Sequence, residues 1–78
     1  MIEIYHKAVL YTQVETFLEN NGIVDYDYSQ VYRSFYINAL DSTIIALLKI
    51  AFGSDIRVLT VTSHRAASRL SGIRNLRP

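Results

Sequence analysis

The sequence predicts an α+β fold of the ferredoxin-like type, a split βαβ sandwich with the order βαββαβ and a short C-terminal helix. Four segments with strand patterns alternate with two helical segments in this order, and each helical segment has a start signal and a stop glycine. The 78 residues allow one core only, so we expect a single domain over residues 1–78. Apolar residues make up 50% and charged residues 19%, which indicates a globular chain.

The first strand and the first helix are predicted from the opening 22 residues. Residues 2–10 alternate in side-chain phase, which is typical of a strand. Thr12 and Glu15 have the spacing of a capping box, in which each side chain satisfies an unpaired amide of the other residue. Gly22 suits the left-handed position that ends a helix.

A hairpin is expected next. Residues 24–28 alternate apolar and acidic positions, with Asp25 and Asp27 on one face, and predict a short second strand. Residues 31–40 continue the extended pattern and predict the third strand. The connection between them lacks the usual Asn-Gly or glycine signal of a tight hairpin.

The second helix is predicted to start at Asp41 or Ser42 and to end just before Gly53. Its middle, residues 44–52, is apolar almost all round, which predicts burial on several sides or a place in an interface. It is too short to span a membrane, so we expect a soluble, cytoplasmic protein. Residues 55–63 predict the fourth strand.

Charge is divided unequally along the chain. Residues 1–55 carry a net charge of −4, whereas residues 56–78 hold five arginines and no acid. Such asymmetry often marks an interacting tail. We expect a basic C-terminal helix or tail over residues 63–78.

Within this tail a helix from Ser63 to Gly72 would place Arg65 and Arg69 one turn apart. Two further arginines, Arg74 and Arg77, extend the positive charge. The guanidinium fork of arginine suits phosphate groups, so one predicted partner is the phosphate backbone of a single-stranded nucleic acid. The alternatives are an acidic protein surface, the protein's own acidic body in the same chain or across a homodimer, and a solvated tail without a partner.

Catalytic signals are absent from the sequence. The chain has no cysteine, its glycines are isolated, and His6 and His64 do not have metal-ligand spacing. We expect His6 to lie in the core or at a sheet edge, because it falls on the apolar phase of its strand. Asp25 and Asp27 lack a third ligand nearby. These observations predict no enzymatic activity, no metal and no cofactor.

Tyrosines supply the candidate binding surface. In a ferredoxin-like sheet the first and third strands are neighbours, so Tyr5 and Lys7 would share an open face with Tyr32 and Tyr36. Aromatic rings beside a cation on an open sheet are typical of proteins that stack single-stranded RNA. The stretch "RSFYINAL" has a faint likeness to an RNA-recognition strand. The alternative is that the tyrosines pack against the C-terminal helix or a second copy.

The elements "MIEI", "VETFLENNGI", "VYRSFYI" and "LDSTIIALLKIAFG" resemble the RegA family, the translational repressors of T4-type phages. The resemblance covers about half of the chain, and this chain is shorter than that family. It implies RNA binding near initiation codons, and Lys7 is the one residue that carries over. The first helix departs from the family pattern, because Gln13, Glu15, Glu19 and Asn20 stand where the family has basic residues.

Together these patterns predict a small non-enzymatic regulator that binds single-stranded RNA or DNA through tyrosines and C-terminal arginines. The alternative function is a small phage-type inhibitor that contacts a host protein through the helix over residues 44–52 or through the tyrosine face.

Overall fold

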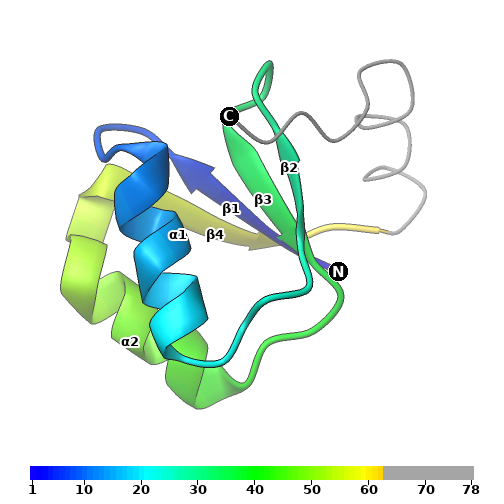
Figure 1. Ribbon diagram of the computed structural model, residues 1–78, viewed down its shortest axis with the longest axis vertical. Coiled ribbons are helices and arrows are strands. Elements are labelled where there is room, and N and C mark those ends of the chain that lie inside the picture. Colours follow the sequence, from blue (N-terminus) through cyan, green and yellow to red (C-terminus); the bar gives the residue numbers. More distant parts are fainter. Residues whose placement is uncertain (63–78) are drawn as a thin grey trace.

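Two helices cover one face of a four-stranded antiparallel sheet in the computed structural model of the protein, which describes residues 1–62 (Figure 1). The elements in chain order are β1 (Ile2–His6), α1 (Tyr11–Asn20), β2 (Asp27–Ser29), β3 (Ser34–Ile37), α2 (Ser42–Phe52), a 3-10 turn η1 (Gly53–Asp55) and β4 (Ile56–Thr60). The strand order across the sheet is β2-β3-β1-β4. The predicted α+β class and the order of the first six elements are confirmed.

The register of the sheet divides its side chains between two faces. Ile4 of β1 lies opposite Phe35 of β3 and Val58 of β4. Because side chains alternate along a strand, these three residues share one face. Glu3 and Tyr5, on either side of Ile4, belong to the other face. We call this second face, which α1 and α2 do not cover, the open face.

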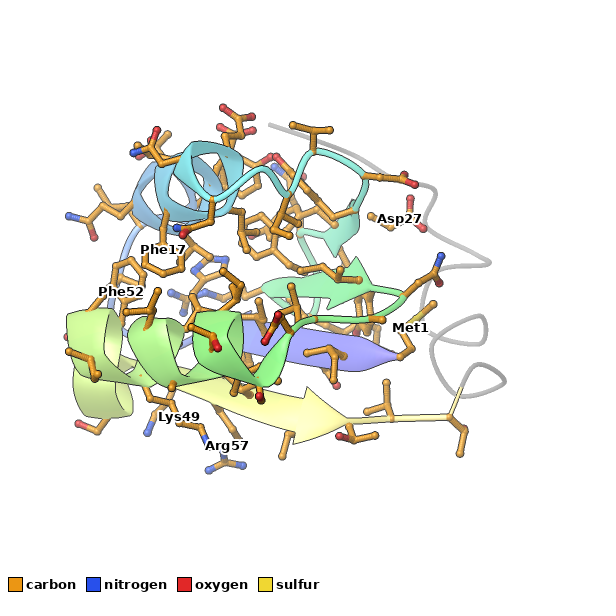
Figure 2. All side chains as sticks on the ribbon, turned by 90° about the horizontal axis from the view of Figure 1, so that it is seen from below. Met1, Phe17, Asp27, Lys49, Phe52 and Arg57 are labelled. Atoms are coloured by element: carbon orange, nitrogen blue, oxygen red, sulfur yellow. The ribbon has the colours of Figure 1, made fainter. Side chains whose placement is uncertain are left out.

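The core lies between the helices and the Ile4 side of the sheet. Leu18 of α1 and Leu48 of α2 are fully buried against Ile4 and Phe35. Phe17 and Phe52 join the two helices, with ring centroids 5.7 Å apart in an edge-on contact (Figure 2). This apolar layer holds β1 in the middle of the sheet and so fixes the position of the residues on its open face.

Helix α1 begins earlier than predicted. Its N-cap is Leu10, whose backbone N–H donates to the side-chain oxygen of Gln13 at 3.2 Å. The predicted pair of Thr12 and Glu15 is therefore wrong, although the one-sided cap used here has the same spacing of three residues. The Glu15 carboxylate instead accepts hydrogen bonds from the hydroxyls of Tyr11 and Tyr26.

The other helix-end signals are confirmed. Asp41 is the N-cap of α2, and its carboxylate accepts from the backbone N–H of Thr43 at 2.9 Å. Gly22 and Gly53 follow the two helices with φ angles of +79° and +56°. Those angles lie in the left-handed region, which glycine enters without a steric penalty.

The strands are shorter than the alternation predicts. Residues 24–26 are not part of β2, and Val24 is exposed. The third strand begins at Ser34 instead of residue 31, because the preceding residues form a turn in which Arg33 has a φ of +52°. A left-handed residue ends the pleated geometry, so the hairpin closes at that point.

Helix α2 was predicted to be buried on several sides or to lie in an interface; the first alternative is wrong, and the second stays a prediction. Leu48 is its buried residue, whereas Leu47 is 40% and Ile50 is 79% exposed. One apolar side faces the core and a second remains on the surface. The predicted helix over residues 63–72 lies outside the described residues.

Candidate nucleic-acid interface

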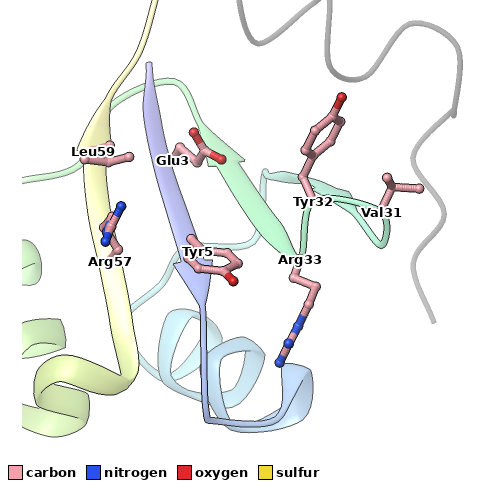
Figure 3. Close-up of a pocket in the computed structure, with 7 residues that line it drawn as sticks. All are labelled: Glu3, Tyr5, Val31, Tyr32, Arg33, Arg57 and Leu59. Atoms are coloured by element: carbon pink, nitrogen blue, oxygen red, sulfur yellow. The ribbon is translucent and has the colours of Figure 1, made fainter.

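A hollow of about 410 Å³ lies on the open face, over β1, β4 and the turn that precedes β3 (Figure 3). We call it the open-face hollow. Its lining residues are Glu3, Tyr5, Val31, Tyr32, Arg33, Arg57 and Leu59. Two arginines, two tyrosines and one carboxylate therefore meet at one surface site.

The β2–β3 turn positions Arg33 at one end of the open-face hollow. Its backbone oxygen accepts from the His6 N–H at 3.1 Å, and its Nη2 donates to the Lys7 carbonyl at 3.0 Å. A left-handed conformation outside glycine costs roughly 1–3 kcal/mol, and these contacts with the end of β1 compensate for that cost. The remaining guanidinium donors lie on an exposed side chain.

Tyr32 precedes Arg33 in the same turn and is 41% exposed. Its backbone N–H donates to the Ser29 hydroxyl at 3.3 Å, which ties the turn to the end of β2. An exposed ring on a fixed backbone can stack on a planar ligand with a small loss of conformational entropy.

Arg57 and Tyr5 are direct partners in the pairing of β4 with β1. Directly opposed residues have Cβ atoms about 4.5–5.5 Å apart. Arg57 is exposed and Tyr5 is half-buried, so a cation and an aromatic ring stand side by side on the floor of the hollow. Such a pair suits a ligand that has both a ring and an anionic group.

Glu3 and Tyr36 form the inner wall of this face. They are direct partners between β1 and β3, and the Tyr36 hydroxyl donates to Glu3 Oε2 at 3.2 Å. The exposed fractions are 3% for Glu3 and 2% for Tyr36, whose ring packs against Met1 and Val61. Tyr36 thus orients the carboxylate, and its buried ring does not offer a surface for stacking.

Beneath the sheet, His6 supports the end of β1 next to Arg33. His6 Nδ1 lies 3.1 Å from the Val9 carbonyl, which makes Nδ1 the protonated nitrogen of the neutral ring. Nε2 then accepts from the Tyr28 hydroxyl. Burial lowers the pKa of His6, the Val9 carbonyl opposes that shift, and the Arg33 charge adds to it. The prediction of a core histidine is confirmed.

A second buried network joins α1 to the segment before β2. Glu15 Oε2 accepts from the hydroxyls of Tyr11 and Tyr26 at 3.0 and 2.9 Å. Burial raises the pKa values of both phenols. These tyrosines face the core side, so three of the six tyrosines, counting Tyr28, serve packing and not the open face.

The predicted site residues are partly brought together. Tyr5 and Tyr32 line the open-face hollow, whereas Tyr36 is buried beside Glu3 and does not line it. Lys7 is exposed just after β1, and its carbonyl holds Arg33. The four tail arginines lie outside the described residues: Arg65, Arg69, Arg74 and Arg77.

The sequence did not lead us to the three charged residues of the hollow, Glu3, Arg33 and Arg57. Arg57 could have been predicted, because its position in the fourth strand alternates with the core-facing residues and places it on the same face as Tyr5. Glu3 shares the phase of Tyr5 in the same way. Arg33 had no such signal, since its position depends on a turn that the sequence does not announce.

Within residues 1–62 no cluster of three metal-binding side chains occurs, and no helix there is both long and apolar enough to cross a bilayer. Comparison with known proteins finds no family model, no curated protein and no solved structure that matches this chain. The resemblance to the RegA family stays a prediction.

Proposed function

We propose that the protein is a small non-enzymatic regulator that binds single-stranded RNA or DNA at the open-face hollow. The observation that carries this proposal is the meeting of Tyr5, Tyr32, Arg33 and Arg57 at one exposed site. Rings that stack bases and guanidinium groups that contact phosphates are the two components of single-strand binding. The strand order and the two helices on one face also support the ferredoxin-like arrangement, whose open sheet serves this purpose in RNA-binding proteins.

Each side chain has a distinct role in the proposal. Tyr32, the more exposed ring, stacks on a base at the rim, and Tyr5 stacks on a second base at the floor. Arg57 and Arg33 contact phosphates at opposite sides of the hollow. The volume of about 410 Å³ falls in the range of small-ligand sites and suits a short segment of strand.

The sequence after Thr62 adds four arginines and no acid. Residues 1–62 alone have a formal charge of −3, which disfavours a polyanion. The tail is therefore proposed to supply the general electrostatic attraction, while the open-face hollow supplies the ordered contacts. A chain truncated after Ser63 should bind more weakly to every strand, without a change in its order of preference.

The test is binding of fluorescent 10-nucleotide RNA and DNA strands of mixed sequence at about 50 mM salt, where a few phosphate contacts still register. Tyr32→Ala should weaken binding about 5- to 100-fold, the loss expected for one stacked base. Ile50→Ala, which removes an exposed apolar group from α2, is the control and should bind like the wild type. No binding by the intact wild-type chain would refute the proposal.

The second candidate is a phage-type inhibitor that binds a host protein, and the exposed apolar side of α2 favours it. Leu47 and Ile50 stand one turn apart, and uncharged Ala46 and Ala51 flank them. Apolar groups of this kind are found at protein interfaces. In that case Ile50→Ala would impair capture of the host protein, Tyr32→Ala would not, and added salt would have little effect.

A further inference from the structure

Strand β4 is an edge of the sheet, and within residues 1–62 no strand lies on its outer side. It spans five residues, whereas β2 at the opposite edge spans three. All five residues of β4 have a partner in β1, so the strand has no bulge, and none of them is a proline. An edge strand of this length without such protection tends to pair with another strand.

Backbone hydrogen bonds identify the groups of β4 that point outward. The Lys7 N–H donates to the Asp55 oxygen at 2.8 Å, and the Val61 N–H donates to the Met1 oxygen at 2.9 Å. Hydrogen-bonded and non-hydrogen-bonded pairs alternate along an antiparallel ladder, so the residues two and four positions after Asp55 also bond to β1. The N–H and C=O groups that point away from β1 belong to the three intervening residues of the strand: Ile56, Val58 and Thr60.

We propose that this edge binds the same edge of a second copy of the chain, antiparallel about a two-fold axis at Val58. In this register Val58 lies opposite Val58 of the second copy, and Ile56 lies opposite Thr60 of the second copy. The backbone groups of all these residues point outward, so three hydrogen-bonded pairs form, with two bonds in each pair. A surface that pairs with itself about a two-fold axis closes after two copies, which makes the assembly a homodimer.

The side chains on the open face of β4 favour this register. Figure 3 shows Arg57 and Leu59 on β4, the outermost strand of that view. A register centred at Arg57 would set two arginines directly opposite each other, and like charges in that position are destabilising. In the proposed register Arg57 lies opposite Leu59 of the second copy, and the two arginines are diagonal neighbours about 7–8 Å apart. Leu59 is 42% exposed, so each arginine stem covers an apolar side chain of the other copy.

Pairing at this edge extends both layers of the molecule. On the helix-covered face, the half-buried Val58 meets its own copy and continues the apolar layer. On the open face, the two hollows lie on one continuous sheet, and each is lined by its own Arg57. The surface of the hollows stays uncovered, because the second copy is added beside the sheet and not on top of it. The dimer itself does not depend on nucleic-acid binding.

The first experiment is amide hydrogen exchange of the full chain, without nucleic acid, at about 20 μM and about 1 mM protein. The Val58 and Thr60 N–H groups should exchange at least about three-fold more slowly at the higher concentration, because they gain partners only in the dimer. Tyr28 supplies the control. It lies opposite Phe35, whose phase in β3 is that of Arg33, which bonds to β1. The Tyr28 N–H thus points outward at the β2 edge and should exchange equally at both concentrations.

Variants studied by sedimentation equilibrium test the register. Thr60→Pro removes an outward N–H that the pairing with β1 does not use, and it should weaken association about ten-fold, because two symmetric bonds are lost. Thr60→Ala keeps the N–H and is the matched control, which should associate like the wild type. Leu59→Lys sets a cation opposite Arg57 of the second copy and should also weaken association, most at low salt. Thermal melts show whether each variant is folded.

Each outcome decides the proposal. A chain that is monomeric at about 1 mM would overturn it, as would slowed exchange at Tyr28 in place of Val58 and Thr60. Association of a folded Leu59→Lys that equals the wild type would also overturn it. Because no nucleic acid is present in these experiments, a negative result leaves single-strand binding at the open-face hollow in place.

Discussion

The arginines of the open-face hollow should determine part of the salt dependence of the proposed nucleic-acid binding. For single strands, the slope of log K against log salt changes by about 0.7 for each phosphate contact. Arg57 and Arg33 are both exposed and lie on different elements, so each can make one contact independently. We expect Arg57→Ala to reduce the slope by about 0.7 and the double variant with Arg33→Ala to reduce it by about 1.4.

This change in slope has a measurable size. Between 50 and 200 mM salt, one contact corresponds to about 2.6-fold in affinity and two contacts to about seven-fold. Fluorescence anisotropy with one oligonucleotide at four or more salt concentrations resolves this difference. The affinity of the wild type should therefore fall more steeply between 50 and 200 mM salt than the affinity of either variant.

The control is Thr16→Glu, which lowers the net charge by one, as Arg57→Ala does, but on the exposed side of α1. It should shift all affinities slightly and leave the slope within about 0.2 of the wild-type value, since charges beyond a Debye length are largely screened. If Thr16→Glu and Arg57→Ala change the slope equally, the effect is one of net charge, and the reasoning about phosphate contacts in the hollow is wrong.

Three further predictions concern the framework of the site. Tyr28→Phe removes the donor to His6 Nε2 and leaves a buried acceptor unpaired. It should therefore lower the free energy of unfolding, measured by urea titration, by about 1–3 kcal/mol. A loss below about 0.3 kcal/mol would contradict the hydrogen bond. The folded-state pKa of His6 is lowered, so the unfolded chain takes up the proton first and stability should fall as the pH drops below about 6.5. Thermal melts from pH 7.5 to 5 measure this fall, and it should be smaller in His6→Gln. Asp41→Ala removes the cap on the Thr43 N–H and should cost about 1 kcal/mol, whereas Asp41→Ser should recover most of it.

Local chemistry explains why much of the fold follows from the sequence. The ends of α2 were predictable because an N-cap carboxylate and a left-handed glycine act on the backbone a few residues away, with Asp41 and Gly53 as the examples. The phase of β1 was predictable because Ile4 and His6 must face the core while Tyr5 faces away. Three consequences were correct: the helix ends at Gly22 and Gly53, a buried His6, and an open face that holds Tyr5.

The start of α1 shows where local patterns compete. Thr12 with Glu15 and Leu10 with Gln13 have the same spacing, and the sequence favours the threonine as a cap. The structure uses the second pair, and Glu15 instead accepts from Tyr11 and from Tyr26, which lies in a segment after the helix. Glu15 thus has a long-range partner, Tyr26, that no local pattern predicts.

The candidate site depends even more on tertiary structure. Sequence alone determined that this chain is a small α+β domain whose acid and basic charge are separated, and that Tyr5 belongs to a face without helices. Only the tertiary structure decided that Tyr36 is buried against Glu3, and that a left-handed turn brings Arg33 to the hollow that Arg57 borders. The physical reason is the distance along the chain over which each effect operates. The alternation of side chains is set within one strand. A binding surface depends on the register between strands and on turns that no nearby residue specifies.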